Sequence, residues 1–192
     1  MTDLAFAPAA ELASMIRNRE ISPVEVMQAT LSRIEQSQPI LNAFITVAFE
    51  PAMEAAKAAE AAVMGGAVLG PLHGVPLAVK DLVPTAGMRT TWGSLIFKDH
   101  VPSADAEVVR RLKRAGAIVV GKTTTPEFGQ QCLTEAPLFG RTRNAWARRP
   151  QLRRVERRLG GRRRGRACAD RGRDGWRRLD PHPGCLQWRR RL

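Results

Sequence analysis

The charge of this chain changes abruptly near Trp146, and this step limits how much of the sequence can form a folded core. Residues 1–147 contain 14 Lys and Arg and 14 Asp and Glu, so their formal charges cancel. Residues 148–192 contain 17 Arg, no Lys and 4 acidic residues, so 17 minus 4 accounts for the whole net charge of +13. A segment with high net charge and no periodic apolar residues cannot bury enough apolar surface to fold. The sequence therefore predicts a folded part, residues 1–147, and a disordered Arg-rich tail, residues 148–192.

The composition of the tail is typical of GC-rich DNA translated out of frame. A basic arm selected to bind phosphates normally contains Lys as well as Arg, and the tail has no Lys. If each codon loses its first base and borrows the first base of the next codon, Trp176 before Arg177 must become glycine. With allowed third bases, residues 153–158 become G-G-S-S-G-G and residues 173–188 become G-T-D-G-G-G-S-I-R-I-P-A-A-C-N-G. We interpret the tail as the result of a one-base insertion, or a sequencing error of that kind, near codons 147–149.

Helices and short apolar strands alternate along residues 1–147. Ser22-Pro23-Val24-Glu25 offers a capping serine, a proline at the first helical position and a glutamate placed for a capping box. The period of the apolar residues and the Gly and Pro breaks predict helices over residues 9–19, 23–38, 51–64 and 105–114, and strands over 43–47, 75–79 and 117–120. Pro39 is expected to end the second helix, and Val108, Val109 and Leu112 to face inward. Alternation of this kind indicates an α/β fold with a largely covered sheet.

Four motifs follow one another in the folded part: residues 70–81 (GPLHGVPLAVKD), 87–93 (GMRTTWG), 115–128 (AGAIVVGKTTTPEF) and 138–146 (LFGRTRNAW). Together with the two serine–glycine stretches recovered from the tail, they resemble the amidase signature family. The resemblance covers residues 1 to about 147. It implies a mixed central sheet covered by helices, of which this chain holds the N-terminal part, an incomplete amidase domain.

Lys80 is the main candidate for chemistry, because it ends an apolar strand where a long amine can point into a buried site. Burial disfavours the charged form of a lysine, so such an amine can act as a base near neutral pH. Spacing alone favours the simpler interpretation, a solvated lysine paired with a nearby acid. The resemblance instead implies that Lys80 is the base of a Ser–cis-Ser–Lys arrangement that cleaves a small-molecule amide without metal or cofactor. It also implies that Phe128, Gly129 and Gln130 line the pocket for the acyl group.

The serine partners of that arrangement are missing from the chain as written. Val155, Glu156 and Leu179 occupy the codons from which the serines would be read, and the surviving Ser94 and Ser103 match no nucleophile motif. A lysine base without a nucleophile or an oxyanion hole cannot transfer an acyl group. We therefore expect this chain to be inactive.

The remaining polar candidates have simpler interpretations. His73 is expected to shape a turn, His100 to lie in a surface loop, and His182 belongs to the tail; a lone histidine provides no metal-ligand set. The string from Gly116 to Thr123 fits a phosphate-loop pattern ending at Lys122, but its centre reads as a strand, whereas the glycine loop of a phosphate site follows a strand. Asp81 should face away from Lys80 and act structurally.

Alternatives to the amidase interpretation remain open. Within the family, the alternative is one component of a tRNA-dependent amidotransferase. From another class, it is a protein that binds nucleic acid through the Arg-rich tail, and non-specific binding is expected of any such tail. Three cysteines without ligand or disulfide spacing, no leader pattern and no long apolar run predict a cytoplasmic protein that does not enter a membrane.

Overall fold

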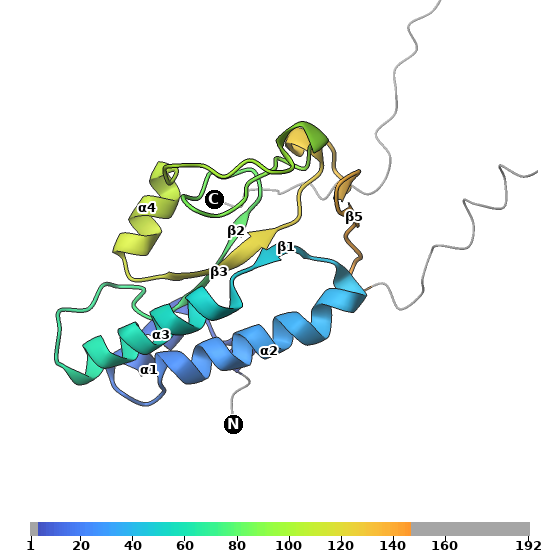
Figure 1. Cartoon of the computed structure of the whole chain (residues 1–192). Coiled ribbons are helices and arrows are strands. Elements are labelled where there is room, and N and C mark those ends of the chain that lie inside the picture. Colours follow the sequence, from blue (N-terminus) through green and yellow to red (C-terminus); the bar gives the residue numbers. More distant parts are fainter. Residues whose placement is uncertain (1–3, 147–192) are drawn as a thin grey trace, which may run out of the picture. The chain divides into compact units, whose positions relative to one another are not determined.

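The computed structural model describes residues 4–146, and both the Arg-rich tail and the interpretation of its frame lie outside this range. Figure 1 shows the arrangement of the described elements. The α-helices are α1 (Ala9–Arg17), α2 (Pro23–Leu41), α3 (Phe49–Met64) and α4 (Glu107–Arg114). The strands are β1 (Phe44–Val47), β2 (Pro76–Lys80), β3 (Ile118–Thr123), β4 (Glu135–Ala136) and β5 (Gly140–Arg141). Three 3-10 helices complete the set, namely η1 (Leu4–Phe6), η2 (Leu95–Phe97) and η3 (Glu127–Gly129).

The central sheet is mixed. Its strand order is β1-β3-β2, with β1 antiparallel and β2 parallel to β3, while β4 and β5 form a separate antiparallel pair. Helices α1, α2 and α3 lie on one side of the sheet, and α4 and the segment between β2 and α4 lie on the other (Figure 1). The α/β class and the mixed sheet covered by helices are therefore confirmed for the described residues.

An extra residue in β3 changes which way its later side chains point. Leu77 of β2 pairs with Val119, but the next residue, Ala78, pairs with Gly121, so Val120 is a bulge. A bulge interrupts the alternation of side chains along a strand. Ile118 and Val120 belong to the core between the sheet and helices α2 and α3. Lys122 projects to the other side of the sheet, toward the segment after β2.

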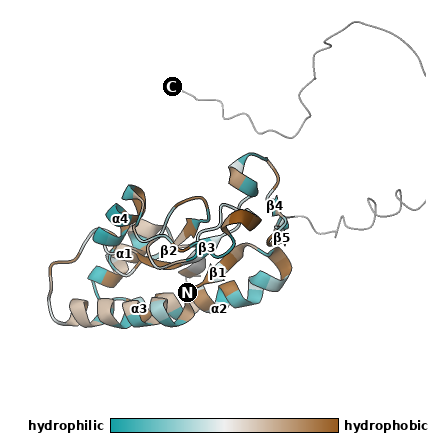
Figure 2. Cartoon of the chain, turned by 45° about the horizontal axis from the view of Figure 1, so that its top comes forward, coloured by the Kyte–Doolittle hydropathy of each residue, from teal (hydrophilic) through white to brown (hydrophobic). Residues whose placement is uncertain are grey.

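The core between the sheet and helices α2 and α3 contains residues that recur with the helical period along α2. Ser22 Oγ accepts from the Val24 N–H at 2.9 Å and the Ser22 N–H donates to Glu25 Oε2 at 2.9 Å, so the capping box is confirmed. Hydrophilic and hydrophobic residues alternate along α2 in Figure 2, as expected of a helix with one buried side. The buried residues of this core come from α2, α3 and β3: Met27, Leu31, Ile34, Ala52, Ala56, Ala59, Ile118 and Val120.

Two local predictions are wrong. Pro39 lies inside α2, which continues to Leu41. Pro39 is exposed, so water can reach the carbonyl that its missing N–H leaves free. The helix ends instead at Asn42, which adopts a left-handed φ of 51°. Val108 was expected to face inward but is 54% exposed, because α4 is short and buries only Val109 against the rest of the protein.

Candidate active site

Lys80 is the last residue of β2, where it pairs with Thr123 of β3. Its side chain is exposed, so residues 4–146 do not form the buried site that the sequence predicted around its amine. Among the residues that the structure describes, the Lys80 amine has no hydrogen-bond or ion-pair partner. The alternative in which Lys80 pairs with a nearby acid therefore finds no acid within residues 4–146.

Asp81 points the other way, into the protein. Its side chain is fully buried, and its carboxylate accepts from the Thr91 N–H at 3.0 Å and from the Thr91 Oγ1–H at 2.5 Å. Thr91 is also fully buried. Hydrogen bonds to a buried carboxylate offset the cost of removing it from water. Asp81 thus ties the end of β2 to the motif of residues 87–93, which agrees with the structural role predicted for it.

Trp92 holds the backbone of the turn after Lys80. Its backbone N–H donates to the Asp81 carbonyl at 3.2 Å, and its indole Nε1–H donates to the Leu82 carbonyl at 3.1 Å. The Val83 N–H closes the turn by donating to the Lys80 carbonyl at 3.0 Å. Trp92 has a φ of 51°, which a large side chain rarely adopts, so the surrounding contacts must stabilise this conformation.

Lys122 contacts the segment that follows Lys80, and the sequence did not predict this contact. It has no exposed surface, and its Nζ donates to the Val83 carbonyl and, at 3.1 Å, to Thr85 Oγ1. Burial lowers the pKa of Lys122 to about 8, against the carboxylates of Asp81 and Asp105, which raise it. Its position inside β3 supports the exclusion of a phosphate loop. The only signal in the sequence is a lysine within a run typical of a buried strand.

Phe128 and Gly129 lie beside the turn that follows Lys80. The Phe128 N–H donates to the Trp92 carbonyl at 2.8 Å. A Cβ on Gly129 would lie 2.7 Å from Leu82 Cδ1, so this glycine is packed directly against the turn. Gln130 is exposed, and its N–H donates to the Glu127 carbonyl at 3.3 Å. Of the three predicted pocket residues, Gly129 therefore packs against the turn after Lys80, and Phe128 contacts Trp92, which holds that turn.

An aromatic cluster adjoins these residues. Phe97 makes edge contacts with Trp92 at 4.8 Å and with Phe128 at 6.3 Å between ring centroids, and His100 stacks on Trp92 at 5.1 Å. Phe128 is 47% exposed. The cluster fixes the rings of segment 92–100 against η3, so the predicted surface position of His100 is confirmed but the residue also has a packing role.

The other polar candidates serve the fold. His73 Nε2 lies 2.9 Å from the Ala59 carbonyl, which ties the turn before β2 to α3, as predicted. Ser94 is buried and caps η2, since its Oγ accepts from the Ile96 N–H at 3.4 Å. Ser103 and Cys132 are exposed. Within residues 4–146, no three His, Cys, Asp or Glu side chains are grouped so that they could hold a metal ion.

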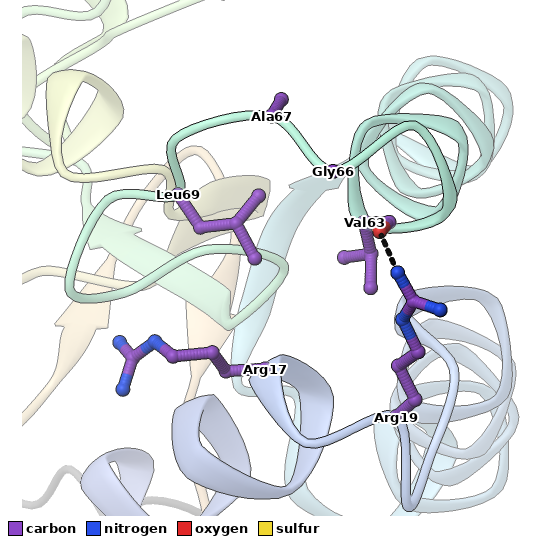
Figure 3. A pocket seen from close by; sticks show the side chains of 6 residues that line it. All are labelled: Arg17, Arg19, Val63, Gly66, Ala67 and Leu69. Atoms are coloured by element: carbon purple, nitrogen blue, oxygen red, sulfur yellow. Dashed lines mark hydrogen bonds between the residues drawn. The ribbon is translucent and has the colours of Figure 1, made fainter.

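Lys80 lines neither of two hollows on the described part of the chain. The smaller, of about 290 Å³, lies between α1, the end of α3 and the loop before β2 (Figure 3). There Arg19 donates to the Val63 carbonyl at 3.2 Å, so its guanidinium caps the end of α3. The larger, of about 640 Å³, lies between the start of α3 and residues 86–89.

Within residues 4–146, the fold is a mixed α/β sheet, and a lysine amine without a hydrogen-bond partner lies at the end of β2, an edge strand of that sheet. Comparison with known proteins identifies it further. The family model described as Amidase matches residues 25–151. The chain belongs to the amidase family.

Relatives and solved structures agree with this assignment. The chain is 46% identical over 146 residues to a glutamyl-tRNA(Gln) amidotransferase subunit from Acidothermus cellulolyticus, a match that covers 76% of this chain and 29% of that protein. It is 48% identical over 147 residues to the corresponding subunit from Nocardia farcinica, covering 76% and 30%. Peptide amidase from Stenotrophomonas maltophilia superposes with a TM-score of 0.67 and 34% identity, covering 73% of this chain and 30% of that one. A bacterial aryl acylamidase gives a TM-score of 0.68 and 33% identity, covering 72% and 29%.

The chain spans about 30% of the length of the curated relatives that it matches. No helix within residues 4–146 is long and apolar enough to cross a membrane.

Proposed function

We propose that this chain is the N-terminal part of an amidase that hydrolyses the C–N bond of a carboxylic amide, with Lys80 as the base of a Ser–cis-Ser–Lys arrangement. The observation that carries the proposal is the free Lys80 amine at the end of β2, beside a turn held by Asp81, Trp92 and Lys122. Similarity to two solved amidases supports the same chemistry.

In the proposed reaction, the Lys80 amine accepts the proton of a bridging serine, which in turn accepts the proton of a nucleophilic serine. The nucleophile attacks the amide carbonyl, the leaving amine takes the proton that Lys80 returns through the bridging serine, and water then hydrolyses the acyl-serine. Gly129, which packs against Leu82, and Phe128, which contacts Trp92, would form part of the acyl pocket, with Gln130 at its edge. No step requires a metal or a cofactor.

Both serines belong to the alternative frame of residues 148–192, so the chain as written is proposed to be inactive. Purified protein should hydrolyse aryl and alkyl amides no faster than buffer. Turnover that is present in this chain and lost in Lys80→Met would show that another residue is the nucleophile.

Deleting one base near codons 147–149 tests the proposal directly. The corrected gene should read past codon 192 through both serine–glycine stretches, and its product should hydrolyse amides. Lys80→Met should abolish that turnover, whereas Lys98→Met, which removes an exposed lysine, should leave it unchanged. A corrected frame that soon reaches a stop codon, or turnover that does not depend on Lys80, contradicts the proposal.

A second candidate is a role in a tRNA-dependent amidotransferase, favoured by the 42–48% identity to glutamyl-tRNA(Gln) amidotransferase subunits. The corrected protein distinguishes the two. An amidase hydrolyses free amides alone, whereas an amidotransferase component would transfer ammonia to a tRNA-linked acid only in the presence of its partner subunits.

The third alternative is that the protein binds nucleic acid through its Arg-rich tail. An accidental polycation binds phosphates without regard to sequence, and its affinity falls steeply with salt. Competition between defined and random oligonucleotides at physiological salt tests this. A preference of about a hundredfold, roughly 2.7 kcal/mol, that disappears when residues 148–192 are deleted would favour a nucleic-acid reader over an amidase remnant.

A further inference from the structure

Lys122 is a fully buried lysine to which the proposed reaction assigns no role. Its two hydrogen bonds both go to the segment that follows Lys80, at Val83 and Thr85. We propose that Lys122 is a positioning residue that fixes the end of β2 from which the Lys80 side chain extends. This inference rests on the proposed function of Lys80 as the base.

Two consecutive residues of β3 hold the turn from opposite sides. The Thr123 carbonyl accepts from the Asp81 N–H at 3.0 Å, at the residue directly after Lys80. The neighbouring Lys122 reaches past it to the Val83 carbonyl, and the Val83 N–H donates back to the Lys80 carbonyl at 3.0 Å. Lys80 is therefore linked to Lys122 through a single intervening residue, Val83.

The bulge at Val120 makes this contact possible. In a strand that alternated regularly through Val120, Lys122 would share the side of Ile118 and Val120 and point into the apolar core between the sheet and helices α2 and α3. Gly121 also lets β1 lie close, since a Cβ there would be 2.3 Å from the Thr46 carbonyl oxygen. The Val120 bulge thus turns Lys122 toward the segment after Lys80, and Gly121 allows β1 to pack closely against β3 at the next position.

Apolar packing alone does not explain a lysine at this position. A methionine would fill a similar space but could not donate a hydrogen bond, so the Val83 carbonyl would keep only the Thr85 Oγ1–H, which lies 3.3 Å away. The charged groups that face the amine are the carboxylates of Asp81 and Asp105, and both favour its protonated form. With a pKa of about 8, the amine is mostly protonated at neutral pH, and a charged donor makes the stronger hydrogen bond.

Amide hydrogen exchange on the full 192-residue chain tests the positioning. In Lys122→Met, the protection factors of the Asp81 and Val83 amides should fall roughly tenfold or more, the effect of an unmade buried hydrogen bond. Amides of α2 and α3 should change less than about twofold, and Lys98→Met should change neither set. Equal loss throughout the chain, or no loss at Asp81 and Val83, overturns the inference.

Thr85→Val keeps the test decisive if Lys122→Met does not fold. It removes one of the two acceptors while the volume stays similar, so the same two amides should lose protection by several-fold. Unchanged exchange at Asp81 and Val83 in Thr85→Val would also overturn the inference.

The frame-corrected protein gives the catalytic test. Lys122→Met should lower kcat at least roughly tenfold with KM within about twofold, because positioning affects the reacting amine more than substrate binding. A Lys80-dependent enzyme whose kcat is unchanged in Lys122→Met refutes the inference and leaves the proposed function standing. Turnover that does not depend on Lys80 refutes the proposed function. In that case the contact of Lys122 with the turn has no catalytic role either.

Discussion

The stability of the folded part should rise with pH between about 8 and 10.5, and Lys122 should cause this rise. Burial lowers the pKa of Lys122 to about 8 in the folded protein, whereas an unfolded lysine titrates near 10.5. Between these values, the unfolded chain binds the proton and the folded chain releases it. Stability increases with pH wherever the unfolded state binds more protons. The cost of holding the buried charge is therefore fully present below pH 8 and is relieved as the pH rises toward 10.5.

The difference between the two pKa values corresponds to about 3 kcal/mol at roughly 1.36 kcal/mol per pH unit. Urea unfolding of the chain at a series of pH values from 7.5 to 10.5, followed by circular dichroism, measures this change. Lys122→Met lowers stability at every pH, because two acceptors lose their donor, but it should remove most of the rise. The informative quantity is the slope against pH, since other titrating groups contribute equally to both proteins.

Lys98→Met serves as the matched control, because the Lys98 side chain is 61% exposed and its removal should preserve the slope. The m-value should stay constant across the series, so that changes in midpoint report free energy. Parallel pH profiles for the parent chain and Lys122→Met would refute the role of Lys122, whatever their absolute stabilities.

Gly121→Ala and Thr46→Val test the packing of β1 against β3, and Gly66→Ala serves as the control for the first. Gly121→Ala should destabilise the protein by roughly 2 kcal/mol or more, because the new Cβ would overlap the Thr46 carbonyl oxygen and force the strands apart. The Cβ of Gly66→Ala would have no atom within 4 Å, so this substitution adds only the backbone strain of a φ of 70°. It should lower the free energy of unfolding by less than Gly121→Ala in the same urea titration. Thr46→Val should raise the free energy of unfolding by about 1 kcal/mol, because Thr46 Oγ1 is buried without a hydrogen-bond partner in the described structure. A loss of stability in Thr46→Val would indicate that this hydroxyl has a partner, such as a bound water.

Elements set by local chemistry could be predicted from the sequence. The Ser22 capping box depends on residues within a few positions of one another and is confirmed, and the apolar period of α2 places Met27, Leu31 and Ile34 in the core. Pro39 shows the limit of the same reasoning. Its effect depends on whether the carbonyl it leaves free can reach water, which is a property of the folded surface rather than of the local sequence.

The chemistry at the end of β2 was partly predictable. The motif of residues 70–81 singled out Lys80, and the strand period placed Asp81 on the opposite side, where the structure has it on Thr91. The indole of Trp92, which donates to the Leu82 carbonyl, could not be predicted. That contact joins residues ten positions apart through a loop without periodic structure.

Lys80 and Lys122 show why the rest of the site needed three-dimensional information. Each lysine follows apolar residues in a strand, yet one amine is free and the other is fully buried. Their environments differ because the Val120 bulge redirects one side chain and because segment 81–85 folds back over it. Neither event has a signature in the sequence near Lys122. The identity of a catalytic lysine can therefore be proposed from a motif, whereas the lysine that would position it is found only from the contacts between β3 and the turn.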